Sequence, residues 1–246
     1  MTIEIGKVEA IFRYPVKSMA GERLEAANVG WDGIDGDRRL ALRRTQVRSN
    51  FPWLSASKLP DLILFTPVRD EGDVGGGIPT HVRTPDGETM EVFGDALAAE
   101  IERRHGAPVE MMHLRNGVFD AACISVIATD TIEEIGRLAA IDADVRRFRP
   151  NILVRLLRPN PFEEDTWVGG VLSFGDESDG PRVSVTMRDE RCSMVNFDPD
   201  SARTAPEMLK SIVRRNQMNA GIYATVIRTG RLAIGQTIYL HEAVEA

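Results

Sequence analysis

Apolar and polar residues alternate over many short stretches of the chain, the pattern expected of half-buried β-strands. Residues 82–84 and 88–92 flank Pro85-Asp86-Gly87, where Pro presets φ and Gly tolerates a positive φ, so they predict a hairpin. Two apolar runs, at 121–128 and 152–154, predict buried strands. The alternation predicts further strands at 8–13, 24–29, 39–42, 62–65, 171–174, 183–187, 223–228 and 237–241.

Apolar residues at a helical period predict three helices. The first spans 96–105, with Asp95 as its N-cap and Gly106 at its C-terminal end. The second begins at Asp130 and the third at Thr204, each with a glutamate three residues later as in a capping box. The residues predicted to face the core are Leu97 and Ile101, then Ile132, Ile135 and Leu138, then Met208, Leu209, Ile212 and Val213.

Many short strands and few helices predict a β-rich α+β fold. We expect a closed or nearly closed barrel together with a smaller N-terminal β-rich unit. The boundary falls between Gly94 and Gly117 and is taken after residue 105, which gives segments 1–105 and 106–246. Residues 73–77 are glycine-rich but lack the Gly-Lys-Ser/Thr ending of a phosphate loop, so they are interpreted as a linker.

Composition narrows the possible functions. The net charge of -7 argues against general binding of nucleic acid, which depends on positive surface fields. No apolar run approaches the roughly 18 residues that span a bilayer, and no secretory signal is visible, so we expect no membrane partner. The two cysteines cannot make the disulfide framework of a small secreted protein, which favours a cytoplasmic location.

Arginine is nevertheless concentrated in two stretches. Locally basic segments in an acidic chain suit a small anion better than a polymer, although for most of these arginines a solvated strand face is the more ordinary interpretation. The stretches contain Arg38, Arg39, Arg43, Arg44 and Arg48, and Arg146, Arg147, Arg149, Arg155 and Arg158.

Two motifs of the N-terminal half combine cations with a hydroxyl group. Tyr14-Pro15-Val16-Lys17-Ser18 ends the first predicted strand, so the Lys17 ammonium and the Ser18 hydroxyl are presented together. Gly33-Ile34-Asp35-Gly36-Asp37-Arg38 is a glycine turn that leads into a strand with Arg38 at its start. Charge-assisted donors of this kind bind phosphate well.

Two motifs of the C-terminal half add an amide and a thiol. In Phe148-Arg149-Pro150-Asn151, Arg149 suits phosphate, and the Asn151 amide suits the edge of a heterocycle. Asp189-Glu190-Arg191-Cys192-Ser193 follows a strand, and a cysteine beside an arginine is a candidate thiolate and soft metal ligand. Cys123 lies inside an apolar run and is interpreted as a packed core residue. The four histidines show no spacing typical of zinc ligands.

In their order along the chain, these four motifs resemble the N-terminal barrel and MOSC domain of the molybdenum cofactor sulfurase C-terminal family. The pattern is most similar to the amidoxime-reducing members and their bacterial counterparts. Glu164-Asp165-Thr166-Trp167 and Gly221-Ile222-Tyr223 extend the resemblance, which covers residues 8–240. It implies a MOSC-type closed β-barrel with a few helices, in which residues 106–246 are the MOSC domain.

The resemblance also implies a molybdenum cofactor (molybdopterin) and its contacts. Cys192 matches the cysteine whose thiolate ligates molybdenum, and is therefore also the expected catalytic residue. The residues that match or adjoin cofactor-binding positions are Lys17, Ser18, Arg38, Arg149, Asn151, Arg191 and Tyr223.

The chain departs from the family pattern at several positions. Glu190 stands where the reductase branch usually has a small hydroxyl residue, and it would repel an anionic cofactor unless Arg188 or Arg191 pairs with it. Val195-Asn196 replaces a threonine pair, and Ser57 replaces an arginine.

Three functions are compatible with these residues. The leading hypothesis is an oxidoreductase that reduces small N-hydroxylated substrates by oxygen-atom transfer to a molybdenum ligated by Cys192. Its electrons are expected from a separate redox protein, since the chain lacks iron–sulfur cysteine spacing and a dinucleotide fingerprint. The alternatives are a sulfur carrier or transferase with a persulfide on Cys192, and a protein that binds the cofactor without turnover.

Overall fold

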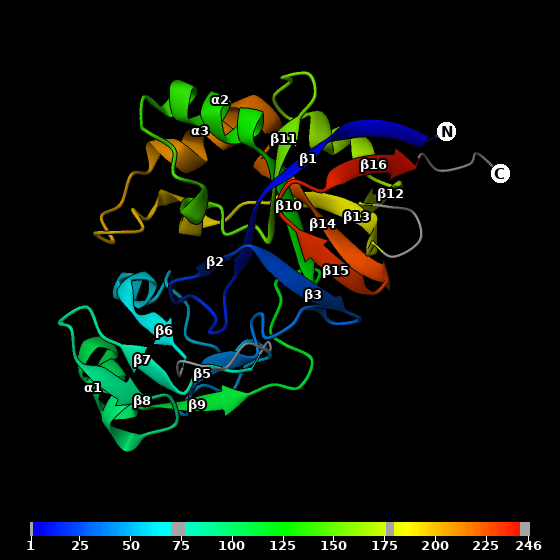
Figure 1. Cartoon of the computed structure of the whole chain (residues 1–246). Helices are drawn as coiled ribbons and strands as arrows, with labels where there is room; N and C mark the ends of the chain where they lie inside the picture. Colours follow the sequence, from blue (N-terminus) through cyan, green and yellow to red (C-terminus); the bar gives the residue numbers. More distant parts are fainter. Residues whose placement is uncertain (1, 70–76, 176–179, 242–246) are drawn as a thin grey trace.

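A closed β-barrel forms the larger part of the structure, a computed structural model that describes residues 2–69, 77–175 and 180–241 (Figure 1). Among the described residues, seven strands follow one another around the barrel in the order β11-β10-β14-β13-β12-β16-β1, and β1 closes it by pairing with β11. The strands are β1 (Thr2–Arg13), β10 (Ile124–Ala128), β11 (Ile152–Leu156), β12 (Val171–Phe174), β13 (Arg182–Glu190), β14 (Asn219–Arg228) and β16 (Thr237–His241).

Apolar side chains from alternate positions of these strands fill the barrel. Trp167, which belongs to a short 3-10 helix η3 (Glu163–Trp167), is 1% exposed and packs with this core. Other core members are Val8, Ile11, Val126, Val154, Leu172, Val185, Ile222 and Ile238. The barrel is therefore a packed core rather than an open channel.

Strand β1 closes the barrel by pairing with two strands that are distant in sequence. Its first half pairs antiparallel with β16 and its second half with β11, and the register shifts between Glu4 and Gly6 and between Val8 and Ala10. Strand β2 (Glu22–Leu24) then pairs with the end of β1. Helices α2 (Thr129–Ala139) and α3 (Glu207–Asn216) lie next to each other over the outside of the barrel (Figure 1). A second apolar cluster fills the space beneath them, including Phe12, Ile127, Ile132, Leu153, Met208 and Ile212.

The middle of the N-terminal half forms a smaller β-rich unit with its own apolar cluster, as expected. Helix α1 (Asp95–His105) lies in this unit beside β8 and β9, and a 3-10 helix η1 (Pro60–Leu64) precedes its three-stranded sheet. The unit's strands are β5 (Leu40–Arg44) paired with β9 (Val109–His113), and β6 (Thr66–Val68), β7 (His81–Arg83) and β8 (Thr89–Glu91). Strands β3 (Ala26–Gly30), β4 (Gly33–Ile34) and β15 (Gly230–Ala233) make one more small sheet. The remaining 3-10 turns are η2 (Val145–Arg147) and η4 (Ser193–Asn196).

Most predicted strands are confirmed to within a few residues, including the hairpin around Pro85-Asp86-Gly87. The strand predicted at 62–65 is wrong, because Pro60 and Asp61 start the 3-10 helix η1 instead. Of the linker predicted at 73–77, only Gly77 lies within the described residues. The division after residue 105 stays a prediction, and β5 pairs with β9 across it.

The three helices are confirmed, and Gly106 ends α1 in the left-handed region with φ 80°. The three predicted side-chain caps are wrong, since none of these helices has a side-chain hydrogen bond at its N-cap. Leu138 and Val213, predicted to face the core, are 40% and 43% exposed. No helix in the described part of the chain has the length and apolar character needed to cross a bilayer.

Candidate functional site

A cavity of about 380 Å³ opens where barrel loops meet loops of the smaller unit. Its walls come from segments that are far apart in the sequence. The lining residues are Lys17, Ser18, Arg38, Phe51, Ser55, Ala56, Ser57, Asp120, Ser125, Arg147, Phe148, Arg149, Asp189, Glu190, Arg191, Cys192, Met194, Val195 and Tyr223. Seven of the eight residues predicted from the sequence are in this set, and Asn151 is the exception.

Cys192 is exposed in this cavity. It follows the end of β13 and precedes the 3-10 turn η4, with an extended backbone (φ -100°, ψ -175°). Cys123 differs in each respect. It is half-buried against the barrel core, its Sγ lies 3.8 Å from the Ala224 carbonyl oxygen, and burial raises the pKa of its thiol. Of the two cysteines, only Cys192 therefore offers an accessible thiol to a ligand in the cavity.

Three of the predicted cofactor-binding residues have strained backbones. Ser18, Arg38 and Arg149 have φ values of 68°, 50° and 51°, in the left-handed region that residues with a side chain rarely adopt. Strain of this kind persists where the surroundings enforce it, and it is concentrated at ligand-binding and catalytic sites. The three residues come from different segments yet line one cavity.

Lys17 and Arg38 are each held by a carboxylate. Lys17, 7% exposed, lies 2.6 Å through its Nζ from Asp120 Oδ1. Arg38 pairs with the fully buried Asp37, which also accepts a hydrogen bond from the backbone N–H of Tyr14 at 2.7 Å. These ion pairs fix both cations on the cavity wall.

Asn151 lies beneath the lining, only 1% exposed. Its Nδ2 donates to Asp37 Oδ2 at 3.1 Å and to the Phe12 carbonyl oxygen at 3.3 Å, while its Oδ1 accepts from the Ser125 N–H at 3.1 Å and from Arg38 at 3.4 Å. Its amide is thus occupied in holding Arg38 and the start of β10. The predicted direct contact between Asn151 and a cofactor stays a prediction.

Arg149 is the cation of the cavity wall that has no carboxylate partner among the described residues. Its guanidinium stacks on the Tyr14 ring, 4.2 Å from the centroid, and donates to the Met19 carbonyl oxygen at 2.7 Å. Burial lowers the pKa of Arg149 to about 10, so it remains charged at neutral pH. A half-buried, uncompensated cation of this kind favours an anionic ligand.

Arg191 anchors the backbone on which Cys192 sits. Its Nε and Nη1 donate to the carbonyl oxygens of Ala220 and Phe148 at 2.6 and 2.7 Å, and its Nη2 lies 2.9 Å from Asp189 Oδ2. Asp189, 1% exposed, also accepts from the Ser125 hydroxyl at 3.0 Å. These contacts fix the end of β13 to its neighbours and orient Cys192.

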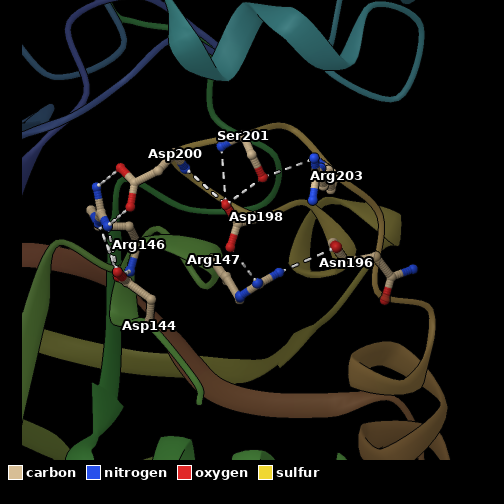
Figure 2. Close-up of polar contacts among 8 residues, drawn as sticks. All are labelled: Asp144, Arg146, Arg147, Asn196, Asp198, Asp200, Ser201 and Arg203. Carbon is tan, nitrogen blue, oxygen red and sulfur yellow. Dashed lines mark hydrogen bonds and ion pairs between the residues drawn. The ribbon is translucent and has the colours of Figure 1, made fainter. Parts of the chain in front are cut away.

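The segment after Cys192 is tied to the 3-10 turn η2 by ion pairs (Figure 2). Arg147, 5% exposed, pairs with Asp198 at 2.9 Å and donates to the Asn196 carbonyl oxygen at 3.2 Å. Arg146 bridges Asp144 and Asp200 at 2.6 and 2.7 Å. Since Met194 and Val195 line the cavity, these pairs hold one of its walls in place.

The sequence did not identify Asp120 or Phe51 as site residues. Asp120 stands directly before the apolar run that contains β10. A charged residue at the start of a buried strand is the sequence feature that could have identified it as a site residue. Phe51 lies in an irregular loop whose place beside the cavity no local pattern reveals. Tyr223, which the sequence did identify, is half-buried on β14, and burial raises the pKa of its phenol.

Three positions where the chain departs from the expected motif pattern also line this cavity, namely Ser57, Glu190 and Val195. Glu190 has no ion-pair partner among the described residues, because Arg188 pairs with Asp165 at 3.0 Å and Arg191 with Asp189. The departures therefore alter the chemistry of the cavity rather than that of the distant surface.

Known proteins resemble this chain in sequence and in fold. A model of the MOSC domain matches residues 102–239, more than half of the chain. The crystal structure of the YuaD protein from Bacillus subtilis is similar over 99% of both chains, with a TM-score of 0.54 and 14% identity. YiiM from Geobacillus stearothermophilus matches over 49% of this chain and 54% of its own, with a TM-score of 0.38 and 18% identity. None of the curated proteins matches the chain.

Proposed function

The chain belongs to the MOSC domain family, a family that binds molybdenum cofactor, and from this we propose that it holds the cofactor in the cavity beside Cys192 and reduces N-hydroxylated compounds. The observation that carries the proposal is the arrangement of one accessible thiol and one uncompensated cation, Arg149, in a single cavity. Thiolate is a soft ligand that suits molybdenum, and the cation suits the phosphate of a pterin cofactor.

The residues present fit such a group. Lys17, Ser18 and Arg38 would hold the phosphate and pterin together with Arg149, and Cys192 would ligate the metal. The strained backbones of Ser18, Arg38 and Arg149 direct these three side chains into one cavity before any ligand arrives, which lowers the ordering cost of binding. Arg191 and Asn151 act one step away, by fixing the Cys192 backbone and the Arg38 guanidinium.

When bound, the cofactor supplies two-electron oxygen-atom transfer. The overall reaction converts an N–OH group, two electrons and two protons into an N–H group and water. We propose that a separate redox protein supplies the electrons, because the sequence carries no nicotinamide fingerprint or iron–sulfur spacing. Purified protein with NADH alone is then inactive toward benzamidoxime, and turnover without any added redox partner contradicts this part of the proposal.

Metal content tests the proposal directly. Protein purified from a molybdenum-replete host should carry stoichiometric molybdenum, and Cys192→Ser should lose it at least tenfold. Arg149→Met should also lower the content, because the phosphate loses a charge-assisted contact. Cys123→Ser serves as the matched control, since Cys123 does not line the cavity. Wild-type protein free of molybdenum, or equal metal in Cys192→Ser, overturns the assignment.

The exposure of Cys192 also favours a second candidate, a sulfur carrier with a persulfide on this residue. Intact-mass analysis of freshly purified protein separates the two functions. A mass increase of one sulfur on Cys192 without bound molybdenum supports the carrier, whereas bound molybdenum and an unmodified thiol support the reductase. Molybdenum without reductase activity under any electron supply indicates a protein that binds the cofactor without turnover.

A further inference from the structure

Charge in the cavity is segregated by depth. The exposed lining residues form a rim that we define as Phe51, Ser57, Asp120, Glu190 and Cys192. The rim contains two carboxylates and no cation. The cations of the lining are all buried or half-buried, and they are Lys17, Arg38, Arg147, Arg149 and Arg191. An anionic ligand fits the cationic interior, but a second molecule that approaches from solvent meets the carboxylates first.

The two rim carboxylates are not equivalent. Asp120 is neutralised by Lys17, 2.6 Å away. Glu190 is not, because the arginines on either side of it pair elsewhere: Arg188 with Asp165 at 3.0 Å, and Arg191 with Asp189 at 2.9 Å. Among the described residues, Glu190 is therefore the rim charge that is free to pair with a ligand, and it is two positions from Cys192.

The rim also offers an aromatic surface. Phe51 is 48% exposed, a large share for a phenylalanine, and its ring lies on the cavity wall. The Lys17 Nζ is 5.6 Å from the ring centroid, a cation–π contact within the protein, and Asp120 neutralises the charge of this lysine. An exposed ring and an unpaired carboxylate on the rim of one cavity can together recognise a flat organic cation, by stacking and by ion pairing.

We infer that Glu190 and Phe51 make the rim selective for planar, positively charged substrates of the guanidinium type over neutral molecules of the same shape. This rests on the proposed function in one respect, that the anionic cofactor occupies the cationic interior and leaves the rim to the substrate. Glu190 then determines specificity, and the charge of the substrate decides how tightly it is held next to Cys192.

A series of three ligands of nearly equal shape tests the inference without turnover. Benzamidine is a cation, benzamide is neutral and benzoate is an anion, and their dissociation constants are measured by calorimetry on the purified full chain. We expect Glu190→Gln to weaken benzamidine about three- to fivefold, the scale of one solvent-exposed ion pair, and to leave benzamide unchanged. Glu190→Lys should weaken benzamidine further and strengthen benzoate.

The matched control is Glu133→Gln, an exposed glutamate on α2 outside the cavity, which should leave all three constants unchanged. Phe51→Leu should weaken benzamidine and benzamide alike, because both lose the ring. Equal benzamidine affinity in wild-type protein and Glu190→Gln overturns the inference. The molybdenum content of the same samples tests the proposed function separately. The ratio of the benzamidine dissociation constants of Glu190→Gln and wild type tests the inference, and it can be measured whether or not molybdenum is bound.

Discussion

The carboxyl group of Glu164 is fully buried between the barrel and α2. Its Oε1 accepts from the Ala128 N–H at 3.2 Å, and its Oε2 lies 2.9 Å from the Thr131 hydroxyl. No cation pairs with it among the described residues, and burial raises its pKa from 4.5 to about 7. The folded protein therefore holds a proton on Glu164 over a pH range in which the unfolded chain has released it.

The sign of the resulting pH dependence follows from this difference. The contribution of Glu164 to stability is complete below pH 4.5 and declines as the pH rises to about 7, because only the unfolded chain gains by ionising there. The decline amounts to about 3 kcal/mol, at 1.36 kcal/mol for each pKa unit. Glu164→Gln keeps a neutral acceptor for the Ala128 N–H and removes this titration. Relative to the wild type, the variant should therefore be more stable at pH 8 than it is at pH 5.

Urea denaturation at pH 5 and pH 8 measures this effect as the difference in the free energy of unfolding. Glu133→Gln, on the exposed face of α2, is the control and should show the pH dependence of the wild type. If Glu164→Gln follows the same pH dependence as the wild type, then the buried carboxyl is not the group that titrates.

At the scale of single residues, the motifs indicated which side chains gather at the site but not how deeply each lies. Short sequence motifs were enough to predict four residues of the site, namely Lys17, Arg38, Arg149 and Cys192. The position of Asn151 beneath the lining could not, since burial depends on what packs above a residue. Similarly, nothing local shows that Arg188 pairs with Asp165 rather than with Glu190.

Among the elements, the segment that joins η4 to α3 depends most on a single side chain. Asp198 Oδ1 accepts from the Ser201 N–H and hydroxyl and from the Asp200 N–H, and its Oδ2 accepts from Arg147 (Figure 2). The hydrogen bond from the Ser201 hydroxyl is the largest cause of the lowered pKa of Asp198. The Asp198 carboxylate therefore keeps its charge, and these hydrogen bonds, at a more acidic pH than an unbonded aspartate would. Below that lowered pKa, the stability it contributes is lost.

Asp198→Ala should release this segment while the barrel remains folded. The buried Arg147 loses its partner, which destabilises the cavity wall formed by Met194 and Val195. Hydrogen exchange followed by mass spectrometry should show faster exchange at 193–203, by at least tenfold, and unchanged exchange in β10 and β14. Asp200→Ala is the comparison, because the exposed Arg146 keeps Asp144 and the effect should be several times smaller. Unaltered exchange at 193–203 in Asp198→Ala would show that Arg147 does not hold this wall.

The centres of the helical faces were predictable because a period of 3.6 residues is a local property, as Leu97 and Ile101 confirm, whereas Leu138 and Val213 proved to be exposed. The caps were not, because a serine, threonine or aspartate before a helix has other uses. Thr204, for example, forms an isolated bridge with Phe197, and α3 begins only at Glu207. The fold class was predictable from element type, whereas the pairing of strands was predictable only for the hairpin around Pro85-Asp86-Gly87.

For the molecule as a whole, the closure of the barrel depends on strand β1. Gly6 pairs with Leu156 of β11 on one side and with Ile238 of β16 on the other, across more than half of the chain. A Cβ at Gly6 would lie 2.2 Å from the Arg155 carbonyl oxygen, so β1 and β11 approach too closely there for any other residue. Sequence periodicity could not show this, since it carries no information about which strands meet.

A fragment and a circular permutant that both begin at residue 106 separate the contribution of β1 to folding from the effect of breaking the chain at that position. A fragment of residues 106–246 contains the other six barrel strands but leaves β11 and β16 with unpaired edges, so it should aggregate or unfold without cooperativity. A circular permutant that begins at residue 106 and ends at residue 105 carries every strand. The start of β1 and the end of β16 can be joined by a short linker because Thr2 pairs with His241, and Figure 1 shows these two strand ends side by side. The permutant should therefore unfold cooperatively on heating, as followed by circular dichroism, whereas a cooperative transition in the fragment would show that the barrel closes without β1.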